Sequence, residues 1–148
     1  TDGIPYWDTG APGLTQMGNY LDRPAEPENT HEPVDSSAAA IAAQGFLRLG
    51  NYLAQDDQGR AERYTAAGLT LLARLLETPY LSTDAKHQGL LLHALYHRPR
   101  GWDHQEDAQS VPYGESCLWG DYHLMEVGLL AQRLAREETY PVFFGPAN

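Results

Sequence analysis

The chain has 148 residues, 42% of them hydrophobic, and 20 acidic against 10 basic residues, which gives a formal net charge of -10. This length fits one domain, and this apolar content is enough to form a core, so a disordered chain is excluded. Nucleic acid and anionic membranes are both disfavoured as partners, because the acidic excess repels them and the basic residues are scattered.

The sequence shows no sign of a disulfide, a membrane span or a signal peptide. Cys117 is a single cysteine, so no internal disulfide can form. There is no apolar run of about eighteen residues, as a membrane span requires. The first residues lack the basic and apolar regions of a signal peptide, which favours a cytoplasmic location over secretion, and without an initiator Met we expect the chain to continue something longer.

The predicted elements begin after a long arm. Residues 1–34 hold five of the ten prolines, which block regular helix, so an arm or long loop is expected there. Asp35 and the two serines after it are typical N-cap residues and precede an Ala-rich helix that runs to Gly50. A second helix is expected from Asp57 until Pro79 stops it.

Two more helices are predicted in the second half. The apolar run within residues 84–96 leaves little polar face, which predicts a short buried helix. After a long loop over residues 97–117, the spacing of apolar residues predicts a last helix over 119–136. Almost no segment alternates with period two, so the predicted class is all-α. Buried first and third helices and two long loops favour part of a ring of helical hairpins over a closed bundle.

Several motifs suggest chemistry, but each has a simpler structural explanation. His93 and His97 have the spacing of two metal ligands on a helix, yet no third ligand stands at a recognised offset, so we expect no metal site. Ser116 lies in a sequence similar to a hydrolase nucleophile elbow, but the closing glycine and the preceding strand are missing. Cys117 has no basic neighbour in sequence and is expected to be a small buried residue.

Carboxylates are plentiful, but no acid–base pair can be identified among them. They include Asp8, Asp103, Glu106, Asp107, Glu115 and Asp121. Most are expected to be solvated or to cap helices, and Asp121 is well placed to interact with the dipole of the last helix. The aromatic residues of the two loop regions are more informative, because aromatic faces beside hydroxyls and carboxylates commonly bind sugar rings.

Four segments, in this order, carry a resemblance to a known family. They are Trp7-Asp-x-x-Ala-Pro12, Asp35-Ser-Ser-Ala-Ala-Ala-Ile-Ala-Ala43, Leu91-Leu-His-Ala-Leu-Tyr-His-Arg-Pro99 and Gly114-Glu-Ser-Cys-Leu-Trp-Gly-Asp-Tyr122. Together they resemble the C-terminal part of the unsaturated glucuronyl hydrolases, glycoside hydrolase family 88. The resemblance implies an (α/α)6 barrel of the six-hairpin glycosidase type, of which this chain is the C-terminal part.

The resemblance also implies a reaction and a set of binding residues. Family members release a 4,5-unsaturated uronic acid from the non-reducing end of oligosaccharides by hydrating its enol ether, with an aspartic acid as proton donor and no cofactor. The key aspartates lie in the N-terminal half of the family's chain, so no catalytic residue carries over. Tyr96, His97 and Ser116 match positions at the sugar pocket, and Trp102 and Trp7 are further candidates for it.

The expected partners are therefore an unsaturated uronic-acid oligosaccharide and the remaining N-terminal half of the barrel, without nucleic acid or membrane. This chain alone is expected to be inactive. Two alternatives remain open: a non-catalytic carbohydrate-binding helical module, and a helical domain that binds another protein. The acidic net charge requires a local cation for a uronate, and His97 and Arg98 are the nearest donors in the sequence.

Overall fold

The computed structural model describes residues 1–105, 107 and 111–139. Over these residues it contains the α-helices α1 (Ser36–Leu53), α2 (Gln58–Leu75) and α3 (Leu118–Ala135), together with three short 3-10 helices. The 3-10 helices are η1 (Pro12–Gln16), η2 (Tyr20–Asp22) and η3 (Arg98–Arg100). Only two isolated β-bridges occur in the described part, so the predicted all-α class is confirmed.

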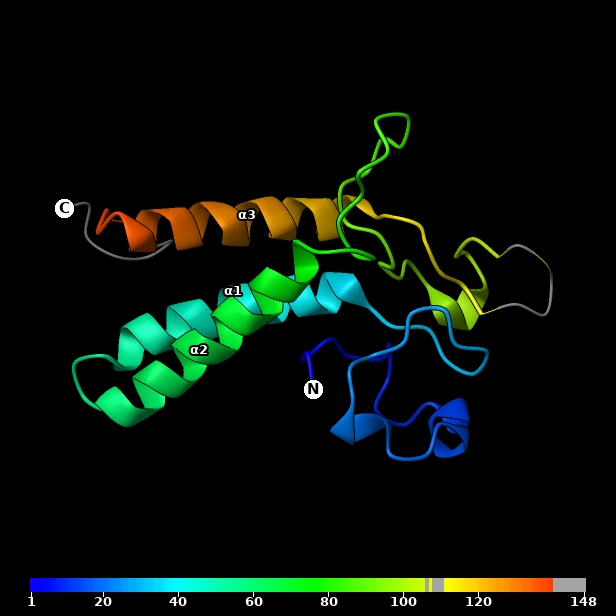
Figure 1. The fold of residues 1–148 in the computed structure, drawn as a ribbon, viewed down its shortest axis with the longest axis horizontal. Helices are drawn as coiled ribbons and strands as arrows, with labels where there is room; N and C mark the ends of the chain where they lie inside the picture. Colours follow the sequence, from blue (N-terminus) through cyan, green and yellow to red (C-terminus); the bar gives the residue numbers. More distant parts are fainter. Residues whose placement is uncertain (106, 108–110, 140–148) are drawn as a thin grey trace.

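Helix α1 lies at the centre of the molecule and contacts both other helices (Figure 1). Its Ala39, Ala40 and Ala43 are completely buried, and small side chains of this kind let neighbouring helices approach closely. On α2, a Cβ added to Gly68 would lie 2.8 Å from the Leu47 side chain, so glycine is required at this crossing. An Ala-rich helix was predicted here, and the close packing explains its composition.

Both long loop regions gather beyond one end of the helices, where α1 and α3 begin and α2 ends (Figure 1). The arm before α1 folds back on itself, because Tyr6 and Val34 form an antiparallel bridge. Asp35 then starts α1 by accepting hydrogen bonds from the amides of Ser37 and Ala38, as its N-cap sequence predicted.

The predicted third helix over residues 84–96 is wrong. The segment begins with a turn, in which the His87 amide donates to the Asp84 carbonyl at 3.0 Å. It then pairs with the chain before it: Leu91 forms an antiparallel bridge with Leu81, and the Leu92 amide donates to the Tyr80 carbonyl at 2.7 Å. His93 has a φ of 61°, in the left-handed region that ends any helix. Leu91 is completely buried in the core formed by all three helices, so its segment is apolar because it is enclosed and not because it is helical.

No helix in the described part of the chain is both long enough and apolar enough to cross a membrane.

Candidate functional site

A large hollow lies where the loops meet the start of α3. It has a volume of about 610 Å³, within the range of small-molecule sites. Its walls come from the segment after the Leu81–Leu91 bridge, from the loop that follows this segment, and from the residues at the start of α3. The lining residues are Ala94, Tyr96, Trp102, Asp103, His104, Glu115, Ser116, Cys117, Leu118 and Trp119. We refer to this hollow as the rim pocket.

Aromatic rings form one wall of the rim pocket. The Tyr96 ring stacks on Trp119 with centroids 5.2 Å apart, and it lies 5.8 Å from Trp102. His97 contacts the other side of this group, with its ring 5.0 Å from that of Trp102. Tyr96 and Trp102 are still 51% and 54% exposed, with the Arg100 guanidinium 5.0 Å from the Trp102 centroid, so the wall offers both open ring surface and a nearby cation to a flat polar ligand such as a sugar ring.

Asp103 fixes the backbone that carries these rings. Its carboxylate accepts hydrogen bonds from the consecutive amides of Tyr96 and His97, the latter at 2.9 Å. Charge-assisted hydrogen bonds of this kind are stronger than neutral ones. Asp103 therefore holds the aromatic wall in place, and this structural role was missed by sequence reasoning, which grouped Asp103 with the candidate acids.

The inner edge of the wall is tied to the start of α1. The Trp119 indole donates to the Ser37 hydroxyl at 3.1 Å, and that hydroxyl donates to Asp35 at 2.6 Å. The same Asp35 oxygen accepts from the Leu95 amide at 3.3 Å. The N-cap of α1 thus also positions the residue before Tyr96, which couples the pocket to the helical core.

Ser116 also lines the pocket and lies against a second fixed segment, which contains Gly89. The Asp121 carboxylate accepts from the amides of Leu90, at 3.0 Å, and Leu91, at 2.8 Å. A Cβ added to Gly89 would overlap the Ser116 side chain. Asp121 lies in the first turn of α3 as predicted, and it also serves as an anchor for an extended segment.

A smaller hollow of about 340 Å³ adjoins the rim pocket and shares His104 and Glu115 with it. In this hollow the imidazole of His87 lies 3.8 Å from the Glu115 carboxylate. Carboxylates, imidazoles and hydroxyls therefore line two neighbouring cavities. Such groups can donate hydrogen bonds to sugar hydroxyls and accept them in return.

The five predicted site residues do not all meet. Tyr96, Trp102 and Ser116 line the rim pocket, and His97 supports it from beside Trp102. Trp7 is not among the lining residues: it packs with the small apolar cluster of the arm, and its indole donates to the buried Glu32 at 2.7 Å. The sequence offered no signal for this pairing, which joins residues 25 positions apart.

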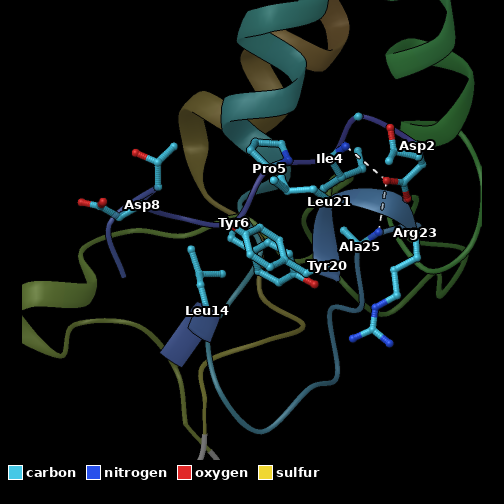
Figure 2. A pocket seen from close by; sticks show the side chains of 13 residues that line it. Asp2, Ile4, Pro5, Tyr6, Asp8, Leu14, Tyr20, Leu21, Arg23 and Ala25 are labelled. Carbon is cyan, nitrogen blue, oxygen red and sulfur yellow. Dashed lines mark hydrogen bonds between the residues drawn. The ribbon is translucent and has the colours of Figure 1, made fainter. Parts of the chain in front are cut away.

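A separate hollow of about 260 Å³ is found on the arm (Figure 2). Tyr6 and Tyr20 meet there edge to face with centroids 5.7 Å apart. Asp2 closes one side by accepting from the amides of Ile4 and Ala25, and it also pairs with Arg74 of α2 at 3.2 Å. These polar groups are engaged in holding the arm on the helices.

The remaining candidate groups have structural partners. The Nδ1 atom of His93 accepts from the Gly114 amide at 3.1 Å, and His93 and His97 do not share a helix face because their segment is not helical. Burial raises the pKa of the Cys117 thiol, so it is not an activated nucleophile. Glu106 lies outside the described residues. Over the described residues, no group of three or more metal-binding side chains is placed to hold an ion.

Comparison with known proteins gives no matching family model. The curated unsaturated glucuronyl hydrolase of Bacillus sp. strain GL1 is 29% identical over 132 residues, which cover 89% of this chain and 28% of that protein. The crystal structure of that enzyme, which is described as responsible for the degradation of glycosaminoglycan, matches this chain with a TM-score of 0.59. The match covers 92% of this chain and 29% of that one, again at 29% identity.

Two further solved structures match this chain at a similar level of identity. A mutant of an unsaturated glucuronyl hydrolase from Streptococcus agalactiae has a TM-score of 0.55 at 27% identity, over 85% of this chain and 28% of that one. Another mutant, described with dGlcA-Glc-Rha-Glc, has a TM-score of 0.59 at 29% identity over 93% of this chain and 29% of its own. This chain thus spans less than a third of the relatives it matches. The predicted resemblance is confirmed in sequence and in fold: the chain is similar to part of the unsaturated glucuronyl hydrolases, glycoside hydrolases built as an α/α barrel.

Proposed function

We propose that this chain is the C-terminal part of a glycoside hydrolase that acts on unsaturated uronic-acid oligosaccharides, and that its rim pocket binds the sugar. The observation that carries the proposal is the stack of Tyr96, Trp102 and Trp119 beside Ser116, Asp103 and Glu115 in one cavity. A sugar ring offers a flat apolar face and a rim of hydroxyls, which this combination of aromatic and polar groups matches.

The proposed reaction is hydration of the enol ether in the unsaturated ring. An aspartic acid adds a proton to C4 and water adds to C5. The resulting hemiketal opens to a ketone at C5 and a hemiacetal at C1, and collapse of that hemiacetal breaks the glycosidic bond and releases the rest of the oligosaccharide as an alcohol. The donor must have a free carboxyl group, whereas Asp103 and Asp121 each accept two backbone amide hydrogen bonds. We therefore assign the proton transfer to the N-terminal half of the barrel and sugar binding to this chain.

The charges around the rim pocket bear on which sugar residue lies there. Its described lining includes the carboxylates Asp103 and Glu115 and the imidazole of His104, without lysine or arginine. Such a lining favours a neutral, hydroxyl-rich ring over a carboxylate. The uronate carboxylate would then lie toward His97, whose ring is beside Trp102, and toward Arg100, whose guanidinium lies 5.0 Å from the centroid of the same ring. The neutral sugar would stack on Tyr96.

Calorimetry with an unsaturated uronide disaccharide tests the binding role. We expect Tyr96→Ala and Trp102→Ala each to weaken binding about tenfold, since one aromatic contact contributes on the order of 1 kcal/mol. Tyr52→Ala is a matched control, because Tyr52 is 75% exposed and lies near the far end of α1. Equal affinity in all four proteins would contradict the proposal.

Activity requires a separate measurement. Loss of the enol-ether absorbance of the same disaccharide is expected only when the N-terminal half of the barrel is supplied together with this chain. Turnover by this chain alone would show that the proton donor lies within it. Binding without turnover, both by this chain alone and by this chain with the N-terminal half, would instead favour the alternative function, a non-catalytic carbohydrate-binding module. The hydrogen bonds of Asp103 and Asp121 to backbone amides are also compatible with that alternative.

A further inference from the structure

His93 lies at the junction between the helical core and the rim pocket. Its side chain is buried, with 5% of the residue exposed, and its carbonyl accepts from the Ser36 amide at the start of α1. Its Nδ1 atom accepts from the Gly114 amide at 3.1 Å. The next residue, Ala94, donates its amide to the Glu115 carbonyl at 3.1 Å. His93 and Ala94 are therefore the points at which the segment 114–116 is attached.

The backbone of His93 is held in an unfavourable conformation. A φ of 61° is uncommon for residues other than glycine, although asparagine, aspartate and histidine adopt it more often than the rest. The ring lies edge to face with Tyr80, at 5.8 Å, and is stacked on Tyr113, at 6.4 Å. The bond to Gly114 requires a neutral imidazole whose proton is on Nε2, because a protonated ring would present a donor to the amide donor.

We propose that His93 is a positioning residue for the rim pocket: its neutral imidazole holds the segment 114–116, and with it Ser116 and Glu115, in the geometry that binds sugar. The proposal rests on the proposed function, and its consequence is that protonation of His93 releases the wall of the pocket. The two cavities would open together, since Gly114 lines the smaller one and Glu115 lines both.

The groups that face His93 leave its neutral form favoured. Burial lowers the pKa of His93 below its ordinary value of 6.5, against a smaller opposing effect from the Glu28 carboxylate. Of the two phenols that face the ring, Tyr80 is neutral near pH 7, because burial raises its pKa. At neutral pH the imidazole is therefore an acceptor, and it becomes protonated only as the pH falls below 6.5.

Two substitutions separate this role from simple packing. Asparagine in His93→Asn tolerates the left-handed backbone and can present an amide oxygen near the position of Nδ1, but it does not titrate. His93→Gly tolerates the same backbone and lacks the acceptor. At pH 7.5, calorimetry on the full chain with the unsaturated disaccharide should give nearly wild-type affinity for His93→Asn and about tenfold weaker binding for His93→Gly, because a half-buried amide loses its partner.

The pH dependence supplies a readout that a packing role would not produce. The ¹⁵N–¹H resonance of Gly114 should shift in wild type with the titration of the His93 ring below pH 6.5, and should remain constant in His93→Asn. Wild type should also lose affinity for the disaccharide at acid pH, and part of this loss should disappear in His93→Asn. Any loss that remains in His93→Asn is due to the other imidazoles near the pocket. Equal weakening of disaccharide binding by both variants would overturn the proposal. So would a Gly114 resonance whose pH dependence is the same in wild type and in His93→Asn. If Gly114 follows His93 but no sugar binds at any pH, the positioning of the loop stands and the proposed function fails.

Discussion

Gly89 lies directly against Ser116, so closely that no side chain larger than hydrogen fits between them. The two residues are 27 positions apart, and the contact sets how far the Ser116 hydroxyl reaches into the rim pocket. It exists because Asp121, at the start of α3, accepts the amides that follow Gly89. One carboxylate on a helix thus determines the position of a loop and of a pocket residue.

Gly89→Ala should displace Ser116 and weaken binding of the unsaturated disaccharide at least about tenfold, while the helices remain folded. The added methyl group overlaps the Ser116 side chain, so one of the two loops must move. Calorimetry measures the affinity, and circular dichroism checks the helix content. Gly59→Ala is the control, since its Cβ would meet only Asp57 at an ordinary 3.8 Å; unchanged affinity in Gly89→Ala would contradict the role of this contact.

Asp103→Ala should disorder the aromatic wall, because the amides of Tyr96 and His97 lose their common acceptor. Affinity for the disaccharide is expected to fall about tenfold or more, as for the loss of hydrogen bonds to a charged group. Asp103→Asn keeps one oxygen acceptor and should lie between wild type and Asp103→Ala. An identical loss in both variants would indicate that Asp103 contacts the sugar as a carboxylate, and a loss in neither would remove it from the site.

Much of the fold was predictable because its signals are local. The N-cap residues Asp35 and Asp57 begin α1 and α2, and apolar spacing within α3 marks a helix over nearly its whole length. The prediction of a helix over residues 84–96 was wrong for a physical reason. Its amides bond to Tyr80 and Asp121, residues outside the segment, and such distant partners leave no periodic signal in a buried apolar run.

The site was predictable only in part, for a similar reason. Tyr96 and Ser116 were identified through motifs that resemble a family, and Trp102 as an aromatic residue of the loop between them; the structure places all three on one cavity. Trp7 lies elsewhere because Glu32 and the arm's own apolar cluster hold it. The residues that position the pocket were missed, since Gly89 and His93 act through contacts that the fold alone creates.

Asp35→Ala should lower the free energy of unfolding by about 1–2 kcal/mol, the usual effect of removing an N-cap side chain. The effect should reach the upper part of that range, because the same carboxylate also accepts from the Ser37 hydroxyl and the Leu95 amide. Urea unfolding followed by circular dichroism measures it. Asp35→Asn should lose less, since an amide oxygen remains; equal losses would show that the negative charge, and not the hydrogen bonds, stabilises α1.

Cys117 should react slowly with iodoacetamide in the folded chain at pH 7.5. Burial raises the pKa of its thiol above the ordinary value of 9.0, so little thiolate is present, although the half-buried residue lines the rim pocket. Mass spectrometry over time should show faster modification in urea than in buffer. Equal rates in the two solutions would mean that the thiol is as reactive in the folded chain as in the unfolded one, and that burial does not raise its pKa.

The outer face of α3 carries an apolar stripe, formed by Leu118, Tyr122, Met125 and Leu129, which are 86%, 55%, 62% and 46% exposed. Their spacing places them on one side of the helix, opposite the side that packs on α1. An exposed stripe of this kind is typical of a surface that is covered in a larger assembly. Under the proposal of a partial barrel, we expect the N-terminal half to cover it.

Light scattering of this chain should therefore show association that grows with concentration. Substituting both Met125 and Leu129 with lysine should suppress it with little change in the free energy of unfolding, because both side chains are exposed. Leu21→Lys is the matched control, since Leu21 is 71% exposed but lies on the arm, away from α3. A clean monomer at every concentration, or equal suppression by Leu21→Lys, would show that the α3 stripe needs no partner, and the partial-barrel proposal would lose its physical basis.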